Sequence, residues 1–333
     1  MTHSTPTGGT VGDGPMDRAP VDRALADRAL DEVDIRGIDI ASVNGITLAH
    51  ESFGDPADVP ILLVMGLGTQ MVGWPDEFCA LLAAAGHHVT RYDNRDVGLS
   101  THLDDLPAGQ PVAAFLGRTA PYRLADMAQD AAELIGALGH ESMHVVGLSM
   151  GGCISQILTL EHPHRVRSLT SMSSTTGSRR VGHPRLDIAR RMITQRSARS
   201  REEAIEIGLA NWRQTGSPGF PFDEERLRLR VARSWDRGYD PAGSGRQFAA
   251  LLAAPDRTAA LSAVTVPTLV LHGEADPLIG VSGGRATARA IPGARLVTYP
   301  GMGHDLPEAL WPSFVAEIAR TVAQAEAART GPA

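Results

Sequence analysis

One serine in the chain lies between glycines at the spacing that exposes a nucleophile. Ser149 is the centre of Gly147-Leu148-Ser149-Met150-Gly151, between a stretch with the pattern of a strand and one with the pattern of a helix. A serine on such a sharp turn stands clear of the sheet, and larger residues two positions away would collide. The following helix directs N–H groups at negative charge that forms nearby. We expect Ser149 to attack a carbonyl carbon; a Gly-rich turn without chemistry is the alternative.

A serine hydroxyl is a weak nucleophile unless a base removes its proton, so a histidine must lie close to it. Among the 12 histidines, His304 lies in Gly301-Met302-Gly303-His304-Asp305, a loop between the last expected strand and the last expected helix. This loop falls at the same edge of the sheet as Ser149. His272 ends a strand, where a packed residue near the site is expected. His304 is therefore the expected base.

The histidine needs a carboxylate that fixes its tautomer and stabilises its charged form. Asp276 directly follows the penultimate strand, and the chain order Ser149, Asp276, His304 is that of a known class of serine enzymes. Glu274 is the rival acid, closer to the end of the strand. Asp305 is expected to start a helix instead, because it cannot easily point at the ring of its own neighbour.

Two backbone N–H groups are expected to bind the oxyanion that forms when the serine attacks. One belongs to Met150, directly after the nucleophile. The other is assigned to Leu67 in the loop Gly66-Leu67-Gly68-Thr69-Gln70, where glycines let the backbone turn under a substrate. This loop has neither of the glycine signatures of nucleotide binding, so no cofactor is expected.

Strands and helices alternate along most of the chain. Asn44-Gly45 predicts a hairpin between strands at 35–43 and 46–52. The pattern further predicts strands at 59–65, 88–92, 142–147, 166–172, 266–273 and 295–299, and helices at 75–85, 124–138, 150–161, 281–290 and 308–325. Such alternation indicates an α/β fold with a mostly parallel sheet covered by helices on both sides.

The alternation stops between Met172 and Val266, where only helical segments are predicted, at 185–197, 202–214, 224–237 and 246–253. We expect a helical cap over residues 175–257, inserted into a core formed by residues 34–174 and 258–328 and placed above the edge of the sheet where ligands bind. Residues 1–33 are rich in Gly, Pro and polar residues and are expected to form a disordered tail.

Charge and composition exclude several classes of partner. The net charge is −7 without a basic block, so neither nucleic acid nor an anionic membrane surface is an expected partner.

The two cysteines, Cys79 and Cys153, are expected to be buried free thiols. No cluster of ligands accompanies His162 and His164, so no metal is expected. With neither a signal peptide nor a transmembrane segment in the pattern, a cytoplasmic protein is expected.

Several segments together resemble the α/β-hydrolase superfamily over about residues 35–325, and within it actinobacterial esterases related to aclacinomycin methylesterase and mycobacterial Lip-type lipases. They read Val64-Met65-Gly66-Leu67-Gly68, Gly73-Trp74-Pro75-Asp76-Glu77-Phe78, Arg91-Tyr92-Asp93-Asn94-Arg95-Asp96, Val146-Gly147-Leu148-Ser149-Met150-Gly151 and Pro300-Gly301-Met302-Gly303-His304. The resemblance implies a carboxylic ester hydrolase with a helical cap and the same three site residues. It also implies that Asp93, Arg95 and Ser100 brace the oxyanion loop. Met65 departs from many relatives, which have a His-Gly pair there.

The residues that line the substrate pocket are less sharply marked, and we expect them to include Gly66, Gln70, Trp74, Trp212 and Trp235. The expected function is that of a serine carboxylic ester hydrolase with a small-molecule ester as substrate. A cofactor-free haloperoxidase and a carbon–carbon bond hydrolase would use the same residues and are the alternatives. A protein that only binds a small molecule is a third interpretation.

Overall fold

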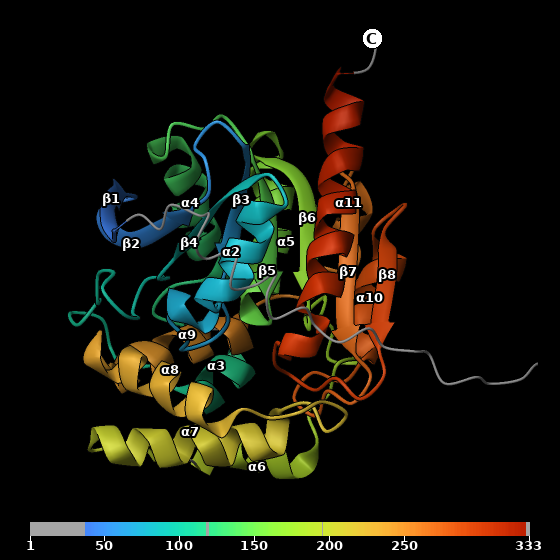
Figure 1. Cartoon of the computed structure of the whole chain (residues 1–333). Helices are drawn as coiled ribbons and strands as arrows, with labels where there is room; N and C mark the ends of the chain where they lie inside the picture. Colours follow the sequence, from blue (N-terminus) through green and yellow to red (C-terminus); the bar gives the residue numbers. More distant parts are fainter. Residues whose placement is uncertain (1–36, 118–119, 195, 331–333) are drawn as a thin grey trace, which may run out of the picture.

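The computed structural model describes residues 37–117, 120–194 and 196–330 (Figure 1). The expected tail, residues 1–33, lies outside these ranges. The described residues form an eight-stranded sheet with the order β1-β2-β4-β3-β5-β6-β7-β8. Neighbouring strands run parallel from β4 through β8, and β2 pairs antiparallel with β1 and β4. The predicted class, a mostly parallel sheet flanked by helices, is confirmed.

Each strand of the sheet has five to eight residues. The strands are β1 Asp39–Val43, β2 Ile46–Phe53, β3 Val59–Val64, β4 His87–Tyr92, β5 Met143–Leu148, β6 Val166–Met172, β7 Thr268–Gly273 and β8 Arg295–Tyr299. The helices are α2 Asp76–Ala84, α3 Pro111–Gly117, α4 Leu124–Ala137, α5 Met150–Glu161, α6 Leu186–Thr194, α7 Arg201–Thr215, α8 Glu224–Asp236, α9 Pro241–Ala253, α10 Ser282–Ala290 and α11 Trp311–Thr330. Short 3-10 turns are η1 Met71–Gly73, η2 Pro163–Arg165, η3 Ala260–Ala263 and η4 Glu308–Leu310.

The hairpin at the start of the sheet follows from its turn residues. Asn44 and Gly45 both have positive φ, 47° and 75°, and they join β1 to β2 with Val43 opposite Ile46. A two-residue turn of this kind matches the twist of the flanking strands, and asparagine and glycine tolerate it best.

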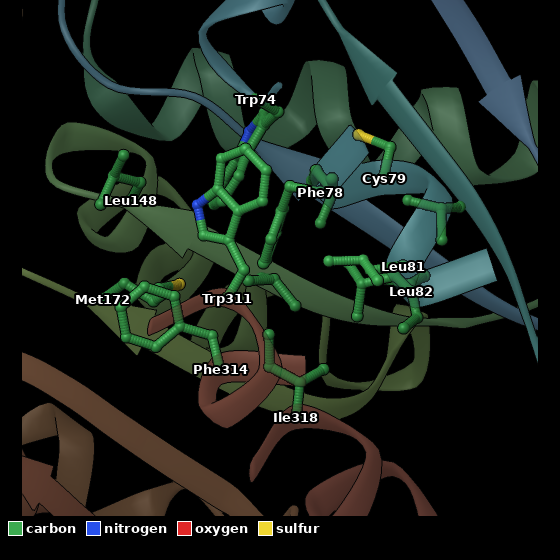
Figure 2. Close-up of a cluster of buried hydrophobic side chains, with 14 of the residues drawn as sticks. Trp74, Phe78, Cys79, Leu81, Leu82, Leu148, Met172, Trp311, Phe314 and Ile318 are labelled. Atoms are coloured by element: carbon green, nitrogen blue, oxygen red, sulfur yellow. The ribbon is translucent and has the colours of Figure 1, made fainter. Parts of the chain in front are cut away.

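Each face of the sheet buries its own core, as β3 shows. Ile61 and Leu63 belong to the cluster that contains residues of α2 and α11, whereas Leu62 and Val64 belong to the cluster that contains residues of α4 and α5. Successive residues of a strand point to opposite faces, so a strand that is covered on both sides is apolar throughout. Figure 2 shows the first cluster, in which Phe314 of α11 lies close to Trp311.

Helices α6 to α9 are inserted between β6 and β7. Three of them begin at a residue whose side chain accepts a hydrogen bond from the first turn: Ser200 before α7, Asp223 before α8 and Asp240 before α9. Such caps satisfy N–H groups that the helix leaves unpaired. Figure 1 shows α6, α7 and α8 as a layer at one end of the sheet.

Candidate active site

Ser149 lies at a sharp turn between β5 and α5. Its φ of 58° and ψ of −119° are rare for a residue with a side chain. Gly147 and Gly151 are required here, because a Cβ on Gly147 would overlap the carbonyl oxygen of Gly151, and a Cβ on Gly151 would overlap the carbonyl oxygen of Val64. The turn therefore brings two backbone segments closer than side chains would allow, and it leaves the serine hydroxyl free to face the loops that follow other strands.

His304 and Asp276 reach Ser149 from loops at the end of the sheet. The His304 Nε2 atom lies 2.9 Å from Ser149 Oγ, and its Nδ1 atom lies 2.7 Å from Asp276 Oδ2. The backbone N–H of His304 donates to the carbonyl oxygen of Thr215, at 2.7 Å. The structure thus brings together the three side chains that the sequence singled out, and the end of α7 holds the histidine loop in place.

The Asp276 carboxylate is oriented by its own loop. Its Oδ1 atom accepts hydrogen bonds from the N–H groups of Leu278 and Ile279, at 2.9 and 2.8 Å. This leaves Oδ2 for His304. The rival acid, Glu274, is exposed and accepts a hydrogen bond from the Thr298 hydroxyl at 2.7 Å.

His272 packs beside this carboxylate, as expected. Its Nε2 atom lies 2.8 Å from the carbonyl oxygen of Ile279 and 3.7 Å from Asp276 Oδ2. Burial, together with the nearby charges of His304 and Arg285, lowers the pKa of His272 despite Asp276. A neutral ring is therefore favoured, in which Nε2–H donates a hydrogen bond to the Ile279 carbonyl oxygen.

The loop after β3 passes close to Ser149. A Cβ on Gly66 would lie 3.2 Å from the Ser149 Cβ and 3.6 Å from its Oγ. The N–H groups of Leu67 and Met150 make no hydrogen bond to another residue in the described part of the chain. Two unpaired donors therefore flank the serine, and such donors can bind an oxygen that becomes negatively charged.

Residues far away in the sequence fix the shape of this loop. Gln247 of α9 accepts a hydrogen bond from Gly68 N–H at 2.8 Å and donates to the carbonyl oxygen of Arg95 at 2.7 Å. Asn94 donates to the carbonyl oxygen of Met65 at 3.1 Å. Gln247 was not predicted from the sequence, because nothing local to it indicates partners more than 150 positions away.

The loop after β4 provides further support, through its side chains. Asp93 accepts hydrogen bonds from the N–H groups of Met71 (2.6 Å) and Leu99 (3.0 Å) and pairs with Arg237 of the loop after α8, at 2.6 Å. Arg95 pairs instead with Asp130 of α4, at 2.6 Å, and Ser100 donates to the Asp93 carbonyl oxygen.

Asp305 was wrongly expected to start a helix. Its carboxylate instead accepts hydrogen bonds from Trp212 Nε1, at 2.9 Å, and from the Ser217 hydroxyl. The same hydroxyl accepts a hydrogen bond from Gly303 N–H at 2.8 Å. Burial raises the pKa of Asp305. The residue after the histidine therefore ties the histidine loop to the end of α7.

A cavity of about 470 Å³ opens above Ser149 and His304, between the loops of the sheet and helices α6, α7 and α8. Its walls are largely apolar and include Ile188, Met192, Leu227, Val231, Leu278 and Leu306. This size and lining are typical of a small-molecule site.

Two of the five expected pocket residues, Gly66 and Trp212, line the cavity, and three do not. Trp74 is fully buried in the core and stacks on Phe78. Gln70 donates to the carbonyl oxygens of Ser234 and Gly238, so it fastens the loop to α8 instead of facing a ligand.

Trp235 was also wrongly expected to line the cavity. It stacks on Tyr239 with ring centroids 4.7 Å apart. The cavity-lining positions of α8 are Leu227, Arg230, Val231 and Ser234, which follow the i, i+3, i+4, i+7 spacing of one helix face. Spacing along α8 thus marks the cavity face better than aromatic character does.

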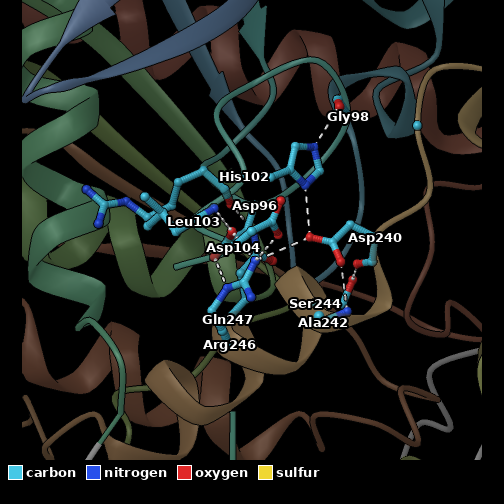
Figure 3. Close-up of polar contacts among 12 residues, drawn as sticks. Asp96, Gly98, His102, Leu103, Asp104, Asp240, Ala242, Ser244, Arg246 and Gln247 are labelled. Atoms are coloured by element: carbon cyan, nitrogen blue, oxygen red, sulfur yellow. Dashed lines mark hydrogen bonds and ion pairs between the residues drawn. The ribbon is translucent and has the colours of Figure 1, made fainter. Parts of the chain in front are cut away.

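Asp96, His102 and Asp240 place possible metal-ligand atoms within 4.8 Å of one another. The cluster already contains a cation, because Arg246 donates to Asp96 at 2.7 and 3.0 Å and to Asp240 at 3.3 Å (Figure 3). His102 lies 2.9 Å from the same Asp240 oxygen. These contacts use the lone pairs that a metal would need, and they join the loop after β4 to α9.

None of the helices in the described ranges is both long and apolar enough to cross a bilayer.

Comparison with known proteins agrees with this geometry. Residues 59–308 match a protein family whose description is "alpha/beta hydrolase fold". The chain is 33% identical to rhodomycin D methylesterase DauP of Streptomyces sp. strain C5 over 300 residues, and 33% identical to rhodomycin D methylesterase DnrP of Streptomyces peucetius over 295 residues. Each alignment covers 82% of this chain and 94% of the relative. A solved hydrolase of Pseudomonas aeruginosa PA01 superposes with a TM-score of 0.64 at 26% identity, covering 87% of this chain and 98% of that one.

Proposed function

This chain belongs to the α/β-hydrolase family and is an esterase-type hydrolase, and we propose that it cleaves carboxylic esters through an acyl-enzyme on Ser149. The observation that carries the proposal is the pair of short contacts made by His304. One ring nitrogen lies 2.9 Å from the serine hydroxyl and the other lies 2.7 Å from the Asp276 carboxylate.

In the first half of the reaction, Ser149 Oγ attacks the ester carbonyl carbon while His304 Nε2 accepts the hydroxyl proton. Asp276 accepts a hydrogen bond from Nδ1–H and stabilises the imidazolium that forms. The carbonyl π-electrons move to the oxygen, which the N–H groups of Leu67 and Met150 bind. When the tetrahedral intermediate collapses, the C–O bond to the alcohol breaks, and His304 gives its proton to the departing alcohol oxygen.

In the second half, water replaces the alcohol. His304 removes a proton from the water as its oxygen attacks the acyl carbon, and the same N–H groups bind the second oxyanion. The bond to Ser149 Oγ then breaks, the proton returns to that oxygen, and the carboxylic acid leaves. No net redox change occurs, and the chain ends in its starting state.

Helices α6 to α9, within residues 175–257, act in this proposal as a cap that encloses the substrate. The cap supplies one side of the apolar wall of the cavity, and Thr215, Trp212 and Ser217 link it to the histidine loop. A mostly apolar space of about 470 Å³ favours a bulky, ring-containing group over a short acyl chain. The names of the two Streptomyces relatives suggest a methyl ester, so we propose methyl esters of bulky acids as substrates.

The test is the release of acid, measured in a pH-stat, from methyl esters of acetic acid and of polycyclic aromatic acids. We expect turnover with a preference for the bulky esters. Ser149→Ala should reduce kcat by about five or six powers of ten, whereas Ser262→Ala, at an exposed serine in η3, should have no effect. Undiminished hydrolysis by the Ser149 variant, or no hydrolysis of any ester by the wild type, would contradict the proposal.

A further inference from the structure

One of the charged side chains in the cavity wall belongs to Arg230. Arg230 lies on the face of α8 that lines the cavity, one turn from Leu227 and from Ser234. In the described part of the chain, no hydrogen bond or ion pair to its guanidinium is found. The side chain is only partly exposed, and the cavity that it borders also contains Ser149 and His304.

The other arginines of α8 are all paired. Arg226 pairs with Glu77 (2.7 Å) and Glu308 (3.0 Å). Arg228 pairs with Glu206 and Glu224, both at 3.0 Å, and Arg233 pairs with Asp76 at 2.8 Å. The helix therefore pairs its other arginines with carboxylates of α2, η4, α7 and its own first turn, and among the described residues it leaves Arg230 without such a pair.

Neighbouring charges in the cavity do not neutralise Arg230. The carboxylate whose charge acts on Arg230 is that of Asp305, and its two oxygens already accept hydrogen bonds from Trp212 and Ser217. Arg191, a second cation in the wall, donates to the Asn211 side chain at 3.0 Å. The wall of the cavity thus contains the carboxylate of Asp305, whose oxygens are already engaged, beside the guanidinium of Arg230.

An unpaired charge that is partly withdrawn from water costs free energy. Many buried groups reduce this cost by losing or gaining a proton, but arginine cannot. Burial lowers the pKa of Arg230, but a guanidinium keeps its proton in proteins, so it cannot become neutral as a buried lysine can. The arrangement is stabilised when an anion enters the cavity. A carboxylate matches the planar fork of N–H donors and forms two parallel hydrogen bonds with it.

We propose that the natural substrate carries, besides its ester, a free carboxylate that pairs with Arg230, so that the enzyme acts on monoesters of acids with a second acidic group. This inference rests on the esterase function proposed above. Arg230 then selects and orients the substrate, and it takes no part in the bond changes at Ser149.

The test compares monomethyl esters of dicarboxylic acids, of increasing chain length, with the matching methyl esters whose far end is a neutral amide. Binding is measured by calorimetry in the Ser149→Ala background, and kcat/KM is measured in the Ser149 background. We expect the charged ester to bind about 10- to 100-fold more tightly than the amide at the best chain length. This preference should appear in KM and not in kcat.

Variants on α8 separate pairing from helix stability. Arg230→Gln should abolish the preference, and Arg230→Lys should retain part of it. Arg228→Gln, the matched control on the outer face, should retain all of it. Equal binding of charged and neutral esters at every length, or an equal loss on both in Arg230→Gln, would overturn this inference while leaving the esterase function intact. A binding preference without turnover of either ester would instead contradict the esterase function.

Discussion

Ser149 holds a backbone conformation that few serines adopt. Its φ of 58° costs about 1–3 kcal/mol relative to an ordinary conformation. Its N–H donates to the Met172 carbonyl oxygen at 2.8 Å, and its own carbonyl oxygen accepts from Gly152 N–H and from the Ser174 hydroxyl. These contacts, together with the absence of side chains at Gly147 and Gly151, maintain the strained turn. The strain keeps the hydroxyl in place before a substrate arrives.

Asp276→Asn tests the role of the carboxylate in selecting the histidine tautomer. The N–H groups of Leu278 and Ile279 should hold the amide oxygen of the new side chain, so that its NH₂ group faces His304 Nδ1. Nδ1 must then accept a hydrogen bond, and the ring proton moves to Nε2, where it blocks transfer from Ser149. We expect kcat to fall by about four powers of ten, with an unchanged melting temperature. A loss of less than tenfold in ester hydrolysis would show that the tautomer does not matter.

Local sequence predicted some residues of the site and missed others for identifiable reasons. Ser149 lies in a motif whose glycines are needed within five positions, so its environment could be predicted. Trp74 and Trp235 have no such local signature, and a tryptophan in a core resembles one in a pocket when only the sequence is known. Arg230 and Gln247 acquire their significance from residues on other elements, which no local pattern reveals.

The link between the loop after β4 and helix α9 includes a histidine with an acceptor on each side. His102 Nδ1 faces Asp240 Oδ2 at 2.9 Å, and Nε2 faces the carbonyl oxygen of Gly98 at 3.0 Å (Figure 3). Only the doubly protonated ring can donate to both. Burial alone would lower the pKa of His102, but these hydrogen bonds and the charges of Asp240 and Asp96 outweigh it and raise the pKa.

A raised pKa makes the contribution of His102 to stability depend on pH. The protonated ring stabilises the folded chain fully below the unfolded pKa of about 6.5, and this contribution is lost as pH rises through the higher folded pKa. His102→Ala should therefore destabilise the protein by about 1 kcal/mol near pH 6 and by much less near pH 9. Thermal melting of both proteins across this range measures the difference. A destabilisation that is constant or grows with pH would contradict the assignment.

Element boundaries were predicted well where caps and breakers are local. Helix α5 and strands β6 and β8 have the predicted ends, and the inserted helices begin near Ser200 and Asp223. Helix α3, Pro111–Gly117, was not predicted. Its seven residues are too few to show a helical period.

The sheet joins segments from both sides of the inserted helices into one core. Strand β6, before the insertion, pairs with β7 after it, and α11 near the end of the chain packs on α2 near the start. Alternation of strands and helices predicted the mostly parallel sheet. It does not determine the strand order, in which β3 lies between β4 and β5, because the order depends on how the crossovers wrap and not on any one segment.

Phe314→Ala tests whether this joint core holds the molecule together. Phe314 is fully buried and its ring meets Tyr299 edge-on at 5.1 Å between centroids. We expect the free energy of unfolding to fall by about 3–5 kcal/mol in chemical denaturation. Leu229→Ala, at a side chain that is 66% exposed on α8, is the control and should change it by about 0.5 kcal/mol or less. Similar effects in the two variants would show that α11 does not belong to the main core.

The most direct test of the whole account is covalent labelling with a fluorophosphonate ester, followed by peptide mass spectrometry. The phosphorus accepts an oxygen nucleophile as the acyl carbon would, and fluoride leaves, so the label marks the activated hydroxyl. We predict one label per chain, on Ser149, with labelling abolished in Ser149→Ala and slowed by several powers of ten in His304→Ala. A label on a different residue, or full labelling and ester turnover in the Ser149 variant, would contradict it.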